Sequence, residues 1–101
     1  MLVDLLNVHG WPCSPSVRHW RVEIGSMQKN AARRFTPSMR QRISLAKLYS
    51  DALEQIDGVN YDDAAPRPWP VACPFTLDLL LTAKRAALEV LLGVASDAGQ
   101  E

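Results

Sequence analysis

Apolar side chains recur at steps of three and four residues along most of this chain, which is the spacing of one face of an α-helix. Proline or glycine bounds the stretches that carry this pattern, and no stretch alternates between apolar and polar residues as a half-buried strand does. The pattern therefore predicts an all-α fold, a small helical bundle of three main helices plus a short N-terminal helix, with a proline-rich crossover loop before the last helix.

The short N-terminal helix is predicted over residues 2–9. Gly10 suits a left-handed helix cap, and Pro12 cannot continue a helix. Because no capping residue precedes this helix, we expect it to be the end of a longer one.

The second helix begins after Ser14-Pro15-Ser16, where a capping hydroxyl is followed by a proline that suits a first turn. It extends for about 19 residues, and Gly25 within it is expected to allow close packing against a neighbour. The apolar stripe of this helix consists of Val17, Trp20, Ile24, Met27 and Ala31.

The third helix begins at Thr36-Pro37, which repeats the same start signal, and ends at Asp57-Gly58. Its first apolar residues are out of phase with the later ones, so we expect a kink near residues 43–44. Ser44 is in position to cap a new helix at this kink.

Residues 58–75 contain four prolines, a density that excludes both a helix and a central strand. We expect an extended linker that lies across the helices and is anchored by Tyr61, Trp69 and Phe75. Thr76 is predicted to cap the last helix. Residues 1–95 then form a single helical domain, and the small, polar residues 96–101 are expected to be a frayed tail.

With 48% hydrophobic and 22% charged residues, the chain of 101 residues has the composition of one folded domain. Its formal net charge of zero hides a basic middle and an acidic segment that begins at Asp51. A basic surface can bind nucleic acid, but the neutral total and the lack of a nucleic-acid-binding motif favour basic helices that face the acidic residues. The basic residues are Arg18, Arg21, Lys29, Arg33, Arg34, Arg40, Arg42 and Lys47.

The residues that could carry chemistry match no known site pattern. His9, Cys13, His19 and Cys73 are zinc-ligand types, but their spacing fits no paired-ligand module. Prolines next to both cysteines mark turns rather than an activated nucleophile beside His19. The acidic stretch 57–63 lacks the glycine and glutamate of a calcium loop. We therefore predict no catalytic, cofactor-binding or metal-binding residues, no cofactor and no enzymatic activity, and we assign the three tryptophans to the core.

The apolar runs are too short and too interrupted by charge for a signal peptide or a membrane span. We expect a cytoplasmic protein with reduced cysteines and no membrane partner.

Three sequence blocks carry a resemblance to a known family. They are Gly10-Trp11-Pro12 with residues 17–23, then residues 37–43 with Leu48-Tyr49 and Ala52-Leu53, and finally residues 73–78. In this order and spacing they resemble the bacterial family known as domain of unknown function twenty-nine, over roughly residues 2–81. The motif positions, expected to be structural, are Trp11, Pro12, His19, Trp20, Arg21, Pro37, Met39, Arg40, Tyr49, Cys73, Pro74, Thr76 and Leu77.

The resemblance implies an all-helical fold and no assigned activity. Family members are usually longer at the N-terminus, where their chain is helical and acidic, so the resemblance implies that this chain lacks that half. That missing acidic half is the second surface that the basic helices are expected to face, besides the acidic segment of this chain. Residues 84–101 have no counterpart in the family.

Four apolar helical stripes with this half missing predict a non-catalytic protein-interaction or self-association module, with a protein partner or a homo-oligomer. The alternative is a nucleic-acid-binding regulator or antitoxin-like partner that uses the basic helices within 18–47.

Overall fold

Helices account for all the regular structure in the described part of a computed structural model, in which one isolated bridge pairs Tyr61 with Ala64 and no strand is present. The structure describes residues 1–61 and 64–98, without the side chains of residues 40, 41, 97 and 98. The predicted all-α fold is confirmed. The helices are α1 (Leu2–Gly10), α2 (Val17–Arg34), α3 (Pro37–Arg42), α4 (Leu45–Ile56), α5 (Leu77–Thr82) and α6 (Arg85–Ala98).

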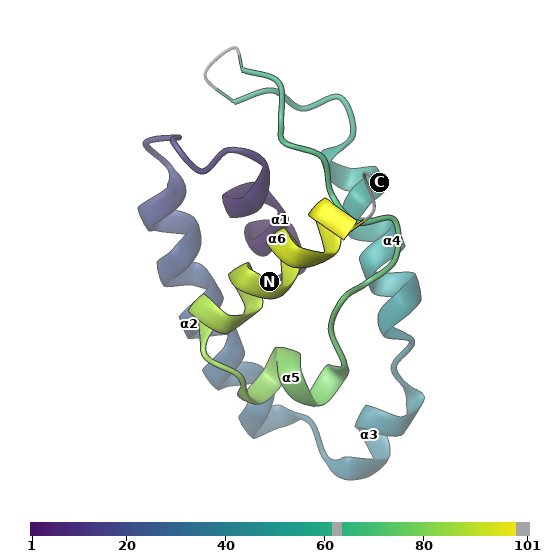
Figure 1. Ribbon diagram of the computed structural model, residues 1–101. Helices are drawn as coiled ribbons and strands as arrows, with labels where there is room; N and C mark the ends of the chain where they lie inside the picture. The colour runs from purple at the N-terminus through teal and green to yellow at the C-terminus, as the bar shows by residue number, and fades with distance from the viewer. Residues whose placement is uncertain (62–63, 99–101) are drawn as a thin grey trace.

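Helix α1 is the centre of the bundle, in contact with α2, α4 and α6 (Figure 1). All of its residues from Asp4 to Gly10 are buried. Leu5 and Leu6 point to different sides of the helix and both have no exposed surface. The N-terminal helix, the shortest of the predicted helices, is therefore the one around which the others pack.

Helix α2 buries the first half of its predicted stripe, Val17, Trp20 and Ile24, and leaves Met27 43% exposed. The expectation of close packing at Gly25 is wrong, because a Cβ atom built there would have no neighbour within 4 Å. Nothing in the packing of α2 therefore requires glycine at this position.

The hydroxyl cap predicted for the second helix is wrong, because Ser16 precedes α2 without a capping hydrogen bond from its side chain. The capping residues predicted for the next two helices are confirmed. The Thr36 hydroxyl accepts a hydrogen bond from the backbone N–H of Met39 at the start of α3. The Ser44 hydroxyl does the same for Lys47 at the start of α4. The kink expected near residues 43–44 is a complete break between these two helices.

The proline-rich linker after α4 is held by side chains that donate to its carbonyl groups. Trp11 Nε1 donates to Ala64 O at 2.8 Å, and the Tyr49 hydroxyl donates to Pro70 O at 2.7 Å. The prolines of this segment carry no N–H and cannot donate, and donors from the helices satisfy several of its carbonyls. Within the segment, Ala64 N donates to Tyr61 O at 3.0 Å.

Three further hydrogen bonds fix the linker to α1. One runs from the backbone, where Arg67 N donates to Gly10 O at 2.8 Å. Trp69 Nε1 donates to Leu6 O at 2.7 Å, and His9 Nε2 lies 2.9 Å from Pro68 O. A carbonyl can only accept, so His9 carries its proton on Nε2. The predicted anchoring of the linker by Trp69 is confirmed.

Gly10 does not have the left-handed conformation predicted for it. Among the described residues the positive-φ glycine is Gly58, with φ of 77°. Trp11, the capping residue that follows α1, has φ of −130°. A Cβ atom on Gly10 would lie 2.7 Å from Trp69 Cζ2 and 3.3 Å from Pro66 Cβ. Glycine is required here by the close approach of the linker and not by the backbone conformation.

The prediction of one continuous last helix is wrong, because it is divided into α5 and α6. At the break, Gln28 Nε2 of α2 donates to Leu80 O at 3.0 Å and to Ala83 O at 2.6 Å. One side chain thereby satisfies two carbonyls at the end of α5.

Helix α6 extends to Ala98, so the predicted domain boundary at residue 95 falls inside a helix. Ser96, which was expected in the frayed tail, is buried, and its hydroxyl lies 3.1 Å from His9 Nε2. Residues 99–101 of that tail lie outside the described residues. None of the helices described has both the length and the apolarity needed to cross a membrane.

Candidate functional site

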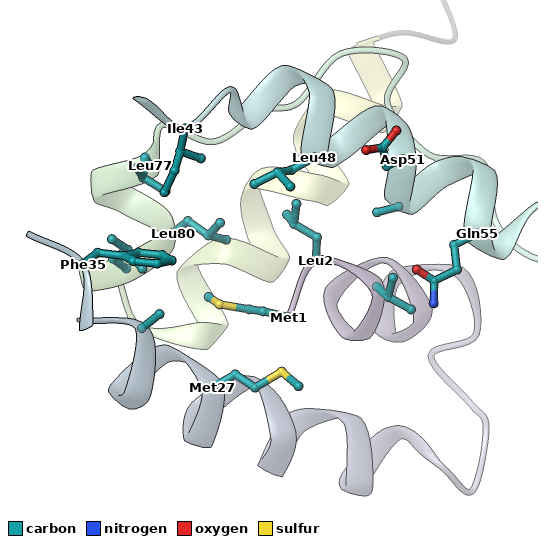
Figure 2. A pocket seen from close by; sticks show the side chains of 14 residues that line it. Met1, Leu2, Met27, Phe35, Ile43, Leu48, Asp51, Gln55, Leu77 and Leu80 are labelled. Carbon is teal, nitrogen blue, oxygen red and sulfur yellow. The ribbon is translucent and has the colours of Figure 1, made fainter. Parts of the chain in front are cut away.

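An apolar groove of about 400 Å³ opens beside the first turn of α1 (Figure 2). Figure 2 shows Met1 and Leu2 at its centre, between Met27 of α2 and Leu48 of α4. The residues that line it are Met1, Leu2, Val3, Met27, Ala31, Phe35, Ile43, Leu48, Asp51, Ala52, Gln55, Leu77, Leu80 and Leu81.

The groove arises because α1 is too short to cover α2. The 9 residues of α1 span about 13 Å, whereas the 18 residues of α2 span about 27 Å. The short loop 11–16 joins the two helices at one end, so α1 covers only the first half of α2. The apolar stripe continues through Met27 and Ala31, and these side chains form a wall of the groove instead of core.

The lining is apolar except at the α4 side, where Asp51 and Gln55 lie. Met27 is 43% exposed and Leu48 is 47% exposed, so both present apolar surface to solvent. Methionine is unbranched and polarisable, which lets it adapt to the shape of a bound side chain. The arrangement suits the binding of apolar groups and offers no cluster of nucleophilic side chains.

Basic side chains stand next to the lining on three elements. Arg34, Arg42 and Lys47 each directly precede a lining residue, and all three are exposed. None of them makes an ion pair with any residue that the structure describes.

Within the described residues the basic side chains form no ion pair with the acidic segment that begins at Asp51, so that expectation is wrong. The other expectation, that the basic helices face an acidic N-terminal half that this chain lacks, stays a prediction. Arg18, Lys29 and Arg33 are also exposed and have no ion-pair partner within the described ranges. Arg21 is paired, but with Glu89 of α6 at 2.9 Å, a residue far from the segment that begins at Asp51. The basic middle of the chain is therefore largely an uncompensated surface.

A buried carboxyl group, which the sequence did not single out, lies in the first turn of α1. Asp4 is only 7% exposed. Burial, a hydrogen bond with Glu23 and the charge of Glu23 together raise the pKa of Asp4 to about 6. Glu23 also pairs with His19 at 3.1 Å, on the exposed face of α2.

The zinc-ligand types do not come together. Within residues 1–61 and 64–98, no three His, Cys, Asp or Glu side chains are placed to hold a metal ion. His9 is buried against the linker, Cys13 is exposed, and the Cys73 thiol donates to Phe75 O at 3.6 Å. Burial raises the pKa of the Cys73 thiol, which lowers its thiolate fraction and its reactivity. The acidic stretch 57–63, which was compared with a calcium loop, includes Asp62 and Asp63, and these two residues lie outside the described residues.

The tryptophans form an aromatic cluster with Tyr61. The Tyr61 ring packs edge-on against Trp11 at 4.7 Å and against Trp20 at 4.9 Å, between ring centroids. Trp69 is 5.7 Å from Trp11, also edge-on. Trp11 and Trp20 are buried and Trp69 is partly buried against them, so their assignment to the core is confirmed.

Several of the other motif residues are buried or stand at the start of a helix. Tyr49 is buried, Thr76 caps α5 through Leu79 N, and Pro37 is the first residue of α3. Pro12 and Met39 are exposed, Pro74 is half-buried, and the side chain of Arg40 lies outside the description. Leu77 is the one motif residue that lines the groove.

No family model, curated protein or solved structure matches the chain. The resemblance to the domain of unknown function therefore stays a prediction, and the groove is the feature from which a function can be argued.

Proposed function

We propose that this protein is a non-catalytic protein-interaction module whose apolar groove receives a helix of a partner protein. The observation that carries the proposal is the part of the α2 stripe that α1 does not cover, where Met27 remains exposed opposite Leu48 of α4 although α5 also packs against α2. Amphipathic helices bind such grooves through apolar residues at i, i+3, i+4 and i+7.

The size of the groove supports this mode of binding. A cavity of about 150 Å³ accommodates a benzene ring, so about 400 Å³ accommodates two or three large side chains. Complete burial of one large apolar side chain contributes about 1.5–3 kcal/mol. Met27 and Leu48 are roughly half exposed, so each would gain about half of that amount when a partner covers it.

The test uses a labelled peptide of about 18 residues with leucine at the anchor positions and glutamine on its flanks. Fluorescence anisotropy should show saturable binding to the unmodified protein. Leu48→Glu should weaken that binding by tenfold or more, since it places a charge in the groove. Val90→Glu is the matched control, because Val90 is an exposed apolar residue of α6 outside the groove. Absence of binding, or an equal loss in both variants, removes the proposal.

Nucleic-acid binding is the second candidate, favoured by the exposed basic residues that have no ion-pair partner in the described structure. An antitoxin-like regulator would use this surface, on helices within residues 18–47. A mobility-shift titration should then show binding that weakens steeply with salt. The candidate is excluded if no shift occurs at low salt.

Self-association is the remaining form of the interaction hypothesis, and a monomer mass by light scattering at high concentration would count against it. We place the module in the cytoplasm, because both cysteines are free, which fits a reducing compartment.

A further inference from the structure

We propose that a second, smaller cavity binds a phosphate dianion, either as the free ion or as the terminal group of a larger molecule. This anion pocket has a volume of about 150 Å³ and lies where the end of α1, the linker, α2 and α6 meet. It shares no lining residue with the groove, so the proposal stands apart from the proposed function.

Two arginines from separate elements line the anion pocket, whereas the lining of the groove contains no arginine or lysine. Arg21 comes from α2, and Arg67 comes from the linker. A guanidinium group carries N–H donors in a planar fork that matches two oxygens of one phosphate group. Two such groups beside one cavity are a donor set suited to a phosphate dianion.

The charge of the anion pocket is positive even though Glu89 also lines it. Both oxygens of Glu89 are occupied, because Arg21 Nη2 donates to Oε1 at 2.9 Å and Arg85 Nη1 donates to Oε2. Arg67 makes no ion pair with any described residue. Three arginines against one glutamate leave an excess of two positive charges.

The end of α1 opposes an anion, because the C-terminus of a helix carries a partial negative charge of about one half. Hydrogen bonds to its last carbonyls reduce this effect. Trp11 N donates to Asn7 O at 2.9 Å, and Arg67 N donates to Gly10 O at 2.8 Å. The remaining partial charge is smaller than the excess on the arginines.

The anion pocket has a buried floor and an open rim. Val8 and His9 are buried, whereas Arg21 and Arg67 are exposed. A cavity of about 150 Å³ accommodates a benzene ring, so the anion pocket has room for one tetrahedral oxyanion, and the rest of a larger ligand stays outside. Burial of the floor reduces the screening of charge by water and so strengthens the contact with an anion.

Both arginines are held in place before a ligand arrives. The ion pair with Glu89 fixes Arg21. Arg67 lies between Pro66 and Pro68, which restrict the backbone around it, and its own N–H is bonded to Gly10 O. Donors that are already positioned lose less freedom on binding, which favours affinity.

The test measures binding of inorganic phosphate to the full chain by isothermal titration calorimetry, with sodium chloride used to keep the ionic strength constant. Saturable binding to the unmodified protein is expected. Arg67→Gln and Arg21→Gln should each weaken it by about tenfold or more, because each removes charge-assisted hydrogen bonds. Arg33→Gln is the matched control, because Arg33 is an exposed arginine of α2 that does not line the anion pocket.

The outcomes decide the proposal. Absence of saturable binding, or an equal loss in all three variants, overturns it, since attraction to the general positive surface would then account for any heat. Circular dichroism establishes that the variants are folded, and Arg67→Gln breaks no ion pair of the described structure.

Two further arms identify the source of the phosphate group and separate this site from the groove. O-phosphoserine should bind like inorganic phosphate if the group belongs to a larger molecule, and its failure to bind assigns the anion pocket to the free ion. Leu48→Glu changes the groove alone and should bind phosphate as the unmodified protein does. Failure of peptide binding therefore leaves the anion pocket standing, and failure of phosphate binding leaves the groove standing.

Discussion

Adding one methyl group at Gly10 should destabilise the protein, whereas the same addition at Gly25 should stabilise it. Both glycines lie in helices, but their surroundings differ. The Cβ atom of an alanine at position 10 would lie 2.7 Å from Trp69 Cζ2, whereas at position 25 it would meet nothing within 4 Å. Trp69 cannot easily move away, because its Nε1 donates to Leu6 O at 2.7 Å and its ring packs against another tryptophan.

The magnitudes follow from these contacts. Overpacking in a closely packed site costs about 1–3 kcal/mol, and alanine regains at most about 1 kcal/mol over glycine in a helix. Gly10 is the last residue of α1, so little of that gain applies there. We expect Gly10→Ala to lower the free energy of unfolding by about 1–2 kcal/mol. Gly25→Ala, in the interior of α2, should raise it by about 0.8–1 kcal/mol.

Urea unfolding followed by tryptophan fluorescence measures both changes on the same protein. Because m-values for small domains are about 1–3 kcal/mol/M, the two midpoints should move in opposite directions by about 0.3–2 M. The reasoning is refuted if Gly10→Ala unfolds at the same urea concentration as the parent, or if both variants shift in the same direction.

Three further substitutions test individual interactions. The pKa of Asp4 is raised from 3.8 to about 6 on folding, so the folded state binds the Asp4 proton more tightly and loses stability as the pH rises from 4 to 6. Asp4→Asn should therefore be more stable than the parent above pH 6, by up to about 3 kcal/mol. Urea unfolding at pH 4 and pH 7 should show that the advantage of the variant grows with pH. An advantage that shrinks as the pH rises would contradict this. Tyr49→Phe removes the donor to Pro70 O and should cost about 1–3 kcal/mol in thermal unfolding, whereas Tyr61→Phe, whose hydroxyl has no hydrogen bond within the described structure, should cost far less. Equal losses in the two tyrosine variants would be the contrary result. Gln28→Glu places a carboxylate against two carbonyl oxygens and should destabilise the protein at pH 7 by about 2 kcal/mol or more in urea unfolding. Unchanged stability would show that the two hydrogen bonds of Gln28 contribute nothing.

Local signals in the sequence predicted the starts of α3, α4 and α5 correctly because they act over a few residues. Thr36, Ser44 and Thr76 each accept a hydrogen bond from an N–H three residues ahead, and this chemistry needs nothing from the rest of the fold. The proline-rich linker was also predictable, since four prolines exclude helix and central strand wherever the segment lies.

The errors come from contacts between residues that are far apart in the chain. At the break between α5 and α6, the carbonyl of Ala83 is satisfied by Gln28, which is 55 residues away in the sequence. The requirement for glycine at position 10 comes from Trp69 and Pro66, which only the folded chain brings against α1. A glycine at the end of a helix with a proline two residues later looks the same in the sequence whether it adopts a left-handed cap or lets another segment approach closely, so its local context predicted the cap.

The candidate site was only partly readable from the sequence. The α2 stripe through Met27 and Ala31 was recognised, but the sequence does not show that α1 covers only the first half of it. The sequence analysis expected the basic residues to be paired with acidic ones, whereas most of those described are unpaired. The neutral net charge was misleading, because it does not show which charges meet in space. Both features depend on how the helices are placed relative to one another.

The most direct test of the groove as a binding site is a nuclear magnetic resonance titration of the labelled protein with the leucine-anchored, glutamine-flanked peptide. If the peptide occupies the groove, the largest changes in methyl chemical shift should fall on Met27, Ala31 and Leu48, and Val90 and Val94 of α6 should stay unchanged. Shifts confined to α6, or no shifts at saturating peptide, would contradict the account.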